Sequence, residues 1–193
     1  MPKQTPSETV GPYFTMGLLR EARNVLVTDA TEGERIRIEG RVTDGAGEPV
    51  SDAMIEIWQA NAHGRYDHPE DTQDKPLDAA FGGFGRAATD DDGAYWFETV
   101  KPGPVPGPGN ALQAPHIGVA VFARGMLRQA YTRIYLAGEA ANENDPVLSA
   151  IDDAERRNTL IASGAGGAAG EGRAVYRFDI VLQGANETVF FDL

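Results

Sequence analysis

The strongest constraint on the fold is a repeated alternation of apolar and polar residues in short runs. In the segment 35–42, Ile36, Ile38 and Val42 fall on one face, and charged residues fall mostly on the other. A period of two residues is that of a β-strand with one buried face. Further strands, separated by turns rich in Gly and Pro, are expected at 53–58, 84–89, 94–99, 116–123, 130–136, 174–182 and 188–191.

Many short strands at regular spacing predict a mainly β chain folded as a β-sandwich. Trp58 and Trp96 alternate with polar residues on two of these strands, so both are expected in the core. We expect residues 1–193 to form one domain, in which residues 1–33 are an irregular N-terminal arm. The arm is rich in apolar side chains, which predicts that it packs on another surface.

One helix is expected among long irregular loops. It covers residues 146–160, with Asp145 as its N-cap and Pro146 at its first position. Long connections are expected at 61–83, which is rich in Asp, and at 101–115, which is rich in Pro. A Gly/Ala-rich tract at 163–172 predicts a mobile loop.

The composition excludes several classes of function. A formal net charge of -12 without a basic stripe argues against nucleic acid and anionic membranes as partners. The chain has no Cys, which excludes disulfides and thiolate metal sites. The first six residues lack the apolar core of a signal peptide, and no apolar run is long enough to span a bilayer. We therefore expect a cytoplasmic protein.

The residues by themselves leave the chemistry open. Two of the three histidines, His63 and His68, lie in the polar loop with Tyr66, and His116 opens a strand. Imidazole, phenolate and carboxylate groups are ligands of iron, so part of this loop is a candidate metal site. A carboxylate-rich loop is more often a solvated surface, and composition alone favours that interpretation.

Five motifs follow one another along the chain: WQANAHGRY at 58–66, FGR at 84–86, KPGP at 101–104, APHI at 114–117 and YRFDI at 176–180. In this order they resemble the signatures of the intradiol ring-cleavage dioxygenases. The resemblance extends over nearly the whole chain, from Thr5 to Leu193. It implies a β-sandwich and the oxidative cleavage of a catechol ring.

Catalytic chains of that family bind a non-haem Fe(III) through two Tyr and two His. The resemblance places these four positions at Tyr66, Val105, His116 and Gly118, and it places Gln113 where catalytic chains have a mechanistic Arg. Because the side chains of Val and Gly carry no donor, most of the affinity for iron should be lost. We therefore expect no catalytic residue and no metal site in this chain alone, with Tyr66 and His116 packed and hydrogen-bonded.

This departure resembles the iron-free α subunits of heteromeric family members, in which a β subunit holds the Fe(III). The resemblance implies that the N-terminal arm packs on the β partner. It also implies that Thr9, Gly11, Pro12 and Arg124 line the substrate pocket of the β partner. From the residues alone, a turn that docks the arm is the favoured role of Thr9, Gly11 and Pro12, and Arg124 is typical of an ordinary surface ion pair.

The reaction implied by the resemblance is cleavage of 3,4-dihydroxybenzoate by O2 to 3-carboxy-cis,cis-muconate. Three alternatives remain open. One is a self-sufficient homomeric dioxygenase that recruits His68 or a loop Asp. Another is a non-enzymatic β-sandwich that binds aromatic ligands or serves as a scaffold. The third is an α chain of a dioxygenase that prefers another substituted catechol.

Overall fold

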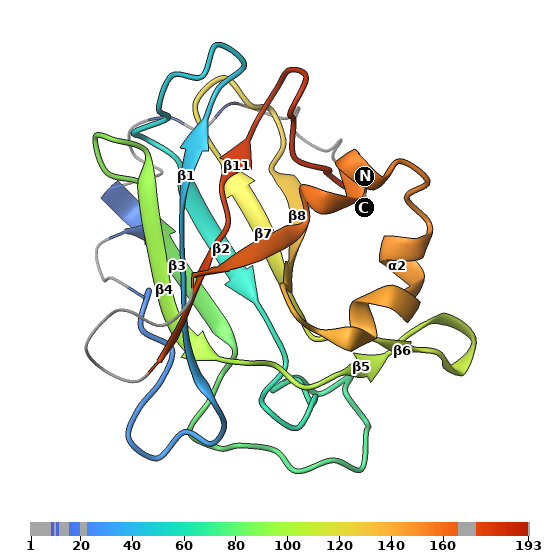
Figure 1. The fold of residues 1–193 in the computed structure, drawn as a ribbon. Coiled ribbons are helices and arrows are strands. Elements are labelled where there is room, and N and C mark those ends of the chain that lie inside the picture. Colours follow the sequence, from blue (N-terminus) through green and yellow to red (C-terminus); the bar gives the residue numbers. More distant parts are fainter. Residues whose placement is uncertain (1–8, 10, 12–15, 20–22, 166–172, 193) are drawn as a thin grey trace, which may run out of the picture.

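The computed structural model describes residues 9, 11, 16–19, 23–165 and 173–192. Its strands form two layers packed face to face, with short helices at one side (Figure 1). The bounds of the strands are β1 Arg35–Thr43, β2 Met54–Trp58, β3 Phe84–Ala88, β4 Ala94–Val100, β5 Val105–Pro106, β6 Leu112–Gln113, β7 His116–Phe122, β8 Ala130–Leu136, β9 Ile161–Ala165, β10 Ala174–Arg177 and β11 Ile180–Val181. Besides a helical turn at residues 16–18, the helices are η1 Pro108–Asn110, η2 Ala140–Asn144, α2 Pro146–Ser149 and α3 Ala154–Asn158.

One layer contains β3, β2, β7 and β8, and the other contains β4, β1, β10 and β11. Strand β9 joins them, because it pairs in parallel with β8 and antiparallel with β10. Strands β5 and β6 form a separate two-stranded hairpin. The predicted mainly β architecture is therefore confirmed.

The core lies between the two layers. Ile36, Ile38 and Val42 of β1 are fully buried, as the alternation predicts. They pack in one cluster with the inward-facing side chains of the opposite layer, including Ile55 and Ile57 of β2. Apolar burial at about 25 cal/mol per Å² stabilises this arrangement.

A second, smaller cluster lies on the outer face of β8. Ala114, Tyr135, Leu148 and Leu160 are buried there, and Phe191 of the C-terminal tail packs against them. Helix α2 and the tail thus cover part of the outer face of the layer that contains β7 and β8 (Figure 1). This covering forms one wall of the cavity described below.

The single helix expected at 146–160 is wrong, because the segment forms two short helices. Asp145 does cap α2, accepting hydrogen bonds from the backbone N–H groups of Val147 and Leu148. The helix stops after Ser149 because a second cap follows. The side chain of Asp153 accepts from the backbone N–H groups that open α3, and Asp favours such capping over the helix interior.

The strand expected at 174–182 is interrupted after Arg177. Up to Glu39, β1 pairs in parallel with β10, and from Val42 onward it pairs in parallel with β11. The backbone of Phe178 crosses close to Gly40, where an added Cβ would lie 1.7 Å from the Phe178 carbonyl oxygen. The side chain of Asp179 then accepts a hydrogen bond from the Arg41 N–H at 2.9 Å, which ends the regular ladder.

The strand expected at 188–191 is also wrong. The segment makes a single bridge, between Phe191 and Tyr131. The backbone of Val189 bonds to side chains: Val189 N donates to Thr159 Oγ1, and Val189 O accepts from Thr132 Oγ1. Thr188 N donates to the Val181 carbonyl. At Val189, side chains thus replace the partner strand that a ladder requires.

Some elements were not expected from the sequence. Strand β9 covers the first part of the Gly/Ala-rich tract, whose residues 166–172 lie outside the described residues.

Trp58 and Trp96 are only half-buried, so the prediction that they lie in the core is wrong. They occupy the outer faces of their strands, and Arg37 lies 4.3 Å above the ring of Trp96.

The arm also contacts this chain. From residue 23 onward it runs along the chain's own strands, where Arg23 bridges to Arg86 and Val25 to Glu98. Leu26 packs against the core. In the described part of the chain, no helix has the length and apolar character that crossing a membrane requires.

Candidate functional site

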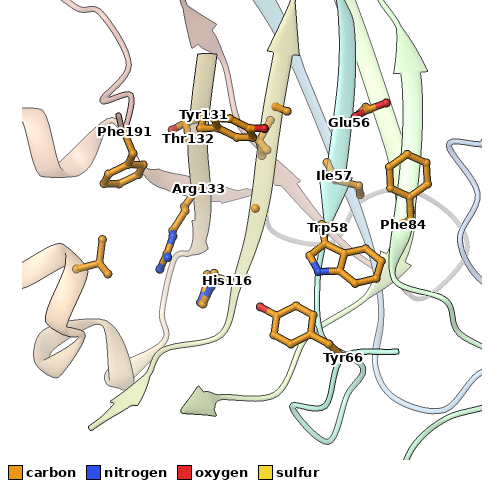
Figure 2. A pocket seen from close by; sticks show the side chains of 14 residues that line it. Glu56, Ile57, Trp58, Tyr66, Phe84, His116, Tyr131, Thr132, Arg133 and Phe191 are labelled. Atoms are coloured by element: carbon orange, nitrogen blue, oxygen red, sulfur yellow. The ribbon is translucent and has the colours of Figure 1, made fainter. Parts of the chain in front are cut away.

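A cavity of about 530 Å³ opens on the outer face of the layer formed by β3, β2, β7 and β8 (Figure 2). Alternation along the strands places its lining there, since the neighbours of the core residues point to the opposite face. Trp58, His116 and Arg133 line it from three different strands, and Phe191 lines it from the tail. A second cavity of about 530 Å³ adjoins it and shares Trp58, Tyr66, His116 and Arg133.

Tyr66 reaches the cavity from the loop that follows β2. Its ring stacks on Trp58, with centroids 5.9 Å apart and an angle of 15° between the planes. Its backbone N–H donates to Asp71 Oδ2 at 2.7 Å, which fixes the loop. Burial raises the pKa of the Tyr66 hydroxyl, although the charge of Arg133 opposes this. The phenol therefore remains protonated at neutral pH.

His116 begins β7 and lies tilted against Tyr135, with ring centroids 5.6 Å apart. Its Nδ1 lies 2.8 Å from the carbonyl oxygen of Ala114. Because a carbonyl only accepts, Nδ1 carries the proton and Nε2 is left as an acceptor. Burial lowers the pKa of His116, and the positive charge of Arg133 adds to this effect against the Ala114 hydrogen bond. The ring is therefore a neutral imidazole.

The four positions that the resemblance equates with iron ligands surround one space. Tyr66, His116 and Gly118 line the first cavity, and Val105 lines the adjoining one with Tyr66 and His116. The structure thus brings all four together, but only Tyr66 and His116 present a donor. A Cβ on Gly118 would meet a single atom within 4 Å, the Trp58 carbonyl oxygen at 3.3 Å. The side of Gly118 that faces the cavity is therefore open.

Arg133 of β8 supplies a positive charge to the cavity, and no role was predicted for it from the sequence. It lies opposite Gly118 in the β7–β8 register. One terminal nitrogen donates to Gln113 Oε1 at 2.6 Å and lies 3.4 Å from the Tyr135 hydroxyl. Figure 2 shows Arg133 between Phe191 and His116, and its guanidinium carbon lies 5.9 Å from the Phe191 ring centroid. The available signal was alternation, which places a charged residue on the outer face of β8.

These residues do not fit ferric iron. Fe(III) binds best to anionic oxygen donors together with imidazole. Here only Tyr66 and His116 of the four positions present a side-chain donor, because the two others are Val105 and Gly118. The guanidinium of Arg133 adds a cation to the same cavity.

The loop residues considered for an unusual metal site lie at the adjoining cavity. His68 and Asp71 line it, together with Glu70. Both oxygens of Asp71 already accept hydrogen bonds, one from Tyr66 N and the other from Gln73 N. The Nδ1 atom of His68 accepts from Glu70 N at 3.2 Å. The loop therefore uses these groups to hold its own conformation.

The residues expected at a partner's pocket lie elsewhere. Thr9 Oγ1 accepts a hydrogen bond from Gly125 N at 2.8 Å, which places this part of the arm beside Arg124. Gly11 is exposed, and Pro12 lies outside the described residues. Arg124 forms an ion pair with Asp52 at 3.1 Å, and 79% of its side chain is exposed. With a rise of about 3.3 Å per residue, the part of β7 between Gly118 and Phe122 alone spans about 13 Å.

Together these features define a β-sandwich protein with an aromatic cavity on the outer face of one layer, and with half of a metal-ligand set inside it. The chain matches the family model described as Dioxygenase over residues 9–184. It is 43% identical to the protocatechuate 3,4-dioxygenase alpha chain of Pseudomonas putida, over 98% of this chain and 96% of that one. This chain therefore belongs to the intradiol dioxygenase family.

Other relatives agree with this assignment. The protocatechuate 3,4-dioxygenase alpha chain of Burkholderia cepacia is 44% identical, over 99% of this chain and 98% of its own length. The beta chain of the same enzyme in B. cepacia is 39% identical, over 86% of this chain and 72% of the beta chain. Intradiol dioxygenases are non-haem iron enzymes, and these relatives include a separate beta chain.

Solved structures show the same fold. The dioxygenase domain of a dioxygenase–carbohydrate-binding fusion from Streptomyces sp. SirexAA-E superposes with a TM-score of 0.64 at 25% identity, covering 95% of this chain and 98% of that one. Catechol 1,2-dioxygenase from Acinetobacter sp. ADP1 has a TM-score of 0.63 at 22% identity, covering 81% of this chain and 55% of that one. The second likeness concerns the fold alone.

Proposed function

We propose that this chain is the iron-free α subunit of a heteromeric protocatechuate 3,4-dioxygenase. Its β partner would hold the Fe(III) and complete an active site that cleaves 3,4-dihydroxybenzoate with O2 to 3-carboxy-cis,cis-muconate. One observation carries the proposal. At the positions of the four ligands, Val105 and Gly118 offer no donor, and Arg133 places a cation in the same cavity.

The similarity to both kinds of chain supports a partner. This chain is 43% and 44% identical to two α chains over nearly its full length, and 39% identical to a β chain. This similarity is well explained if the chain is one half of a heteromer. The proposed unit is therefore a cytoplasmic heteromer. Residues 1–193 contribute a single domain to it, and the N-terminal arm lies against the β partner.

Within that heteromer, Thr9, Gly11, Pro12 and Arg124 would line the substrate pocket of the β partner. The separation of Arg124, and of Thr9 bound beside it, from this chain's own cavity along the length of β7 supports a role at a different site. Thr9 joins the arm to the Arg124 loop through Gly125 N. These contacts place a hydroxyl group and a guanidinium group on one exposed edge of the chain.

Arg124 is suited to neutralise the carboxylate of the substrate. A guanidinium binds a carboxylate through charge-assisted hydrogen bonds, in the best case through two at once. Its present partner is Asp52, in an ion pair whose side chains are 79% and 36% exposed. Such exposed pairs contribute about 0–1 kcal/mol, so exchanging Asp52 for the substrate would cost little.

The proposal is tested by co-expression with a β-type chain that carries the full set of two Tyr and two His. Oxygen uptake is then measured with protocatechuate, catechol and hydroxyquinol as substrates. The proposal expects turnover only when both chains are present, with protocatechuate preferred. Ring cleavage by this chain alone would favour the self-sufficient enzyme, and inactivity of every heteromer would favour a binding or scaffold protein. Preference for another catechol would change the substrate assignment.

A further inference from the structure

We infer that the cavity at Arg133 is a binding site for a small aromatic carboxylate, a molecule of the hydroxybenzoate class, held without any metal. The inference concerns this chain's own cavity and does not rest on the proposed function. It begins from the volume and lining of that cavity. A volume of about 530 Å³ lies within the range of sites that hold small molecules.

The walls fit a planar aromatic ring. Trp58 and Tyr66 present a stacked pair on one side, and Phe84 lies beside them (Figure 2). Phe191 lines the opposite side, next to Arg133. Aromatic faces and edges around a space of this size favour an aromatic ligand over an aliphatic one, through stacking and edge contacts as well as burial.

The charge of the site fits an anion. Among the described residues, Arg133 donates to neutral acceptors, Gln113 Oε1 and the Tyr135 hydroxyl. Within the described part of the chain, it has no ion pair with any carboxylate. A partly buried guanidinium with donors to spare attracts a carboxylate strongly, because the surrounding apolar groups screen the charges less than water does.

The acidic groups nearby do not compete for Arg133. Glu56 also lines the cavity, but its Oε1 accepts from Arg86 Nε at 2.8 Å. Asp145 is fully buried, and its oxygens accept from the Tyr135 hydroxyl and from backbone N–H groups. Glu70 and Asp71 line the adjoining cavity, and both oxygens of Asp71 accept hydrogen bonds within their own loop. Among the described residues, Arg133 therefore remains without a charged partner at the two cavities.

Two further groups supply selectivity. The neutral His116 ring leaves Nε2 as an acceptor, because Nδ1 donates to the Ala114 carbonyl. The Tyr66 hydroxyl lies on the side of the cavity toward His116 and Arg133 (Figure 2). A ring hydroxyl can donate to His116 while the carboxylate meets Arg133. A hydroxybenzoate carries both groups on one ring, and benzoate carries only the carboxylate.

The test is calorimetric titration of the full-length chain with 4-hydroxybenzoate. The neutral isostere 4-hydroxybenzamide serves as the ligand control. We expect saturable 1:1 binding of the acid, and binding of the amide that is weaker by about tenfold or more, as expected for loss of a charge-assisted contact. Equal affinity for the two ligands, or no saturable binding of the acid at millimolar concentration, would overturn the inference.

Variants locate the site. Arg133→Gln should weaken binding of the acid by about tenfold or more, and Gly118→Leu, which adds a side chain toward the open space, should abolish it. Arg128→Gln changes an exposed arginine in the β7–β8 loop and should leave the affinity unchanged. Circular dichroism checks the fold of each variant, and Gly118→Leu decides the question if Arg133→Gln does not fold. Unchanged affinity in a folded Gly118→Leu variant would contradict the assignment.

The number of binding sites can be measured independently in the heteromer. Equilibrium dialysis of the α–β complex with labelled 4-hydroxybenzoate should find one class of site that disappears in the Gly118→Leu complex. The class of site at the partner's iron should persist in that variant. An identical number of sites in the wild-type and Gly118→Leu complexes would refute the inference and would leave the proposed function intact.

Discussion

Asp145 is the residue whose replacement the structure predicts to be most costly, because one buried carboxylate joins helix α2, strand β8 and the segment before β7. It is fully buried. Its Oδ1 accepts from Val147 N, Leu148 N and the Tyr135 hydroxyl, and its Oδ2 accepts from Ala114 N. The change to test is Asp145→Ala.

The expected loss of stability follows from the hydrogen-bonding groups that Asp145→Ala leaves unpaired. Loss of the N-cap of α2 costs about 1 kcal/mol. The Tyr135 hydroxyl and the Ala114 N–H also lose their acceptors in a buried setting, at about 1–3 kcal/mol each. Release of the buried carboxylate offsets part of this, so the expected loss is about 3–5 kcal/mol, as for other broken buried polar networks. Domains of this kind have a total stability of about 5–15 kcal/mol.

Asp153→Ala is the matched control. Asp153 caps α3 through the same kind of hydrogen bonds, to Glu155 N and Arg156 N, but it is exposed and makes no buried contact of the Asp145 kind. Its loss should cost about 1 kcal/mol. Urea unfolding followed by circular dichroism measures both variants. Equal losses in Asp145→Ala and Asp153→Ala would refute the reasoning, since only the cap would then contribute.

Two further predictions concern function and stability. Arg124→Ala in the active heteromer should raise the KM for protocatechuate by about 10- to 100-fold, the loss expected for a charged hydrogen bond. Arg128→Ala in the same loop should not change the KM, and loss of iron from the Arg124→Ala heteromer would contradict the assigned role. Tyr95→Phe should lower the free energy of unfolding by about 1–3 kcal/mol, because the Tyr95 hydroxyl donates to the Phe178 carbonyl at 2.6 Å in the core. Tyr176→Phe is the control for Tyr95→Phe. Equal free energies of unfolding in the two variants would show that the Tyr95–Phe178 hydrogen bond contributes nothing to stability.

Alternation of residue types was enough to predict the sandwich. Ile36, Ile38 and Val42 repeat with the period of a strand, and a strand with one buried face is the regular element that matches this period. Periodicity predicted the wrong bounds where side chains compete with the backbone for hydrogen bonds or where a distant contact interrupts an element. The apolar spacing in 146–160 fits one helix, but Asp153 caps a second one. In 174–182 the interruption depends on a distant contact between Phe178 and Gly40, which no local pattern records.

The site could be predicted only in part for a similar reason. Motif resemblance singled out Tyr66, Val105, His116 and Gly118, because each follows a recognisable run of residues, and these four positions line two adjoining cavities. It was silent about Arg133, which lies in no such run. The importance of Arg133 comes from its register opposite Gly118 across two strands and from the Gln113 contact, and both arise only when the chain folds. The assignments of Thr9, Gly11, Pro12 and Arg124 to a partner's pocket remain predictions.

Iron analysis of the separated subunits tests the central claim most directly. The purified chain, loaded with Fe(III) and then dialysed, should retain no stoichiometric iron and show no visible absorption band of a tyrosinate–Fe(III) centre. The heteromer should carry its iron and its colour with the β subunit. Stoichiometric iron in this chain alone, accompanied by ring-opening turnover, would contradict the account.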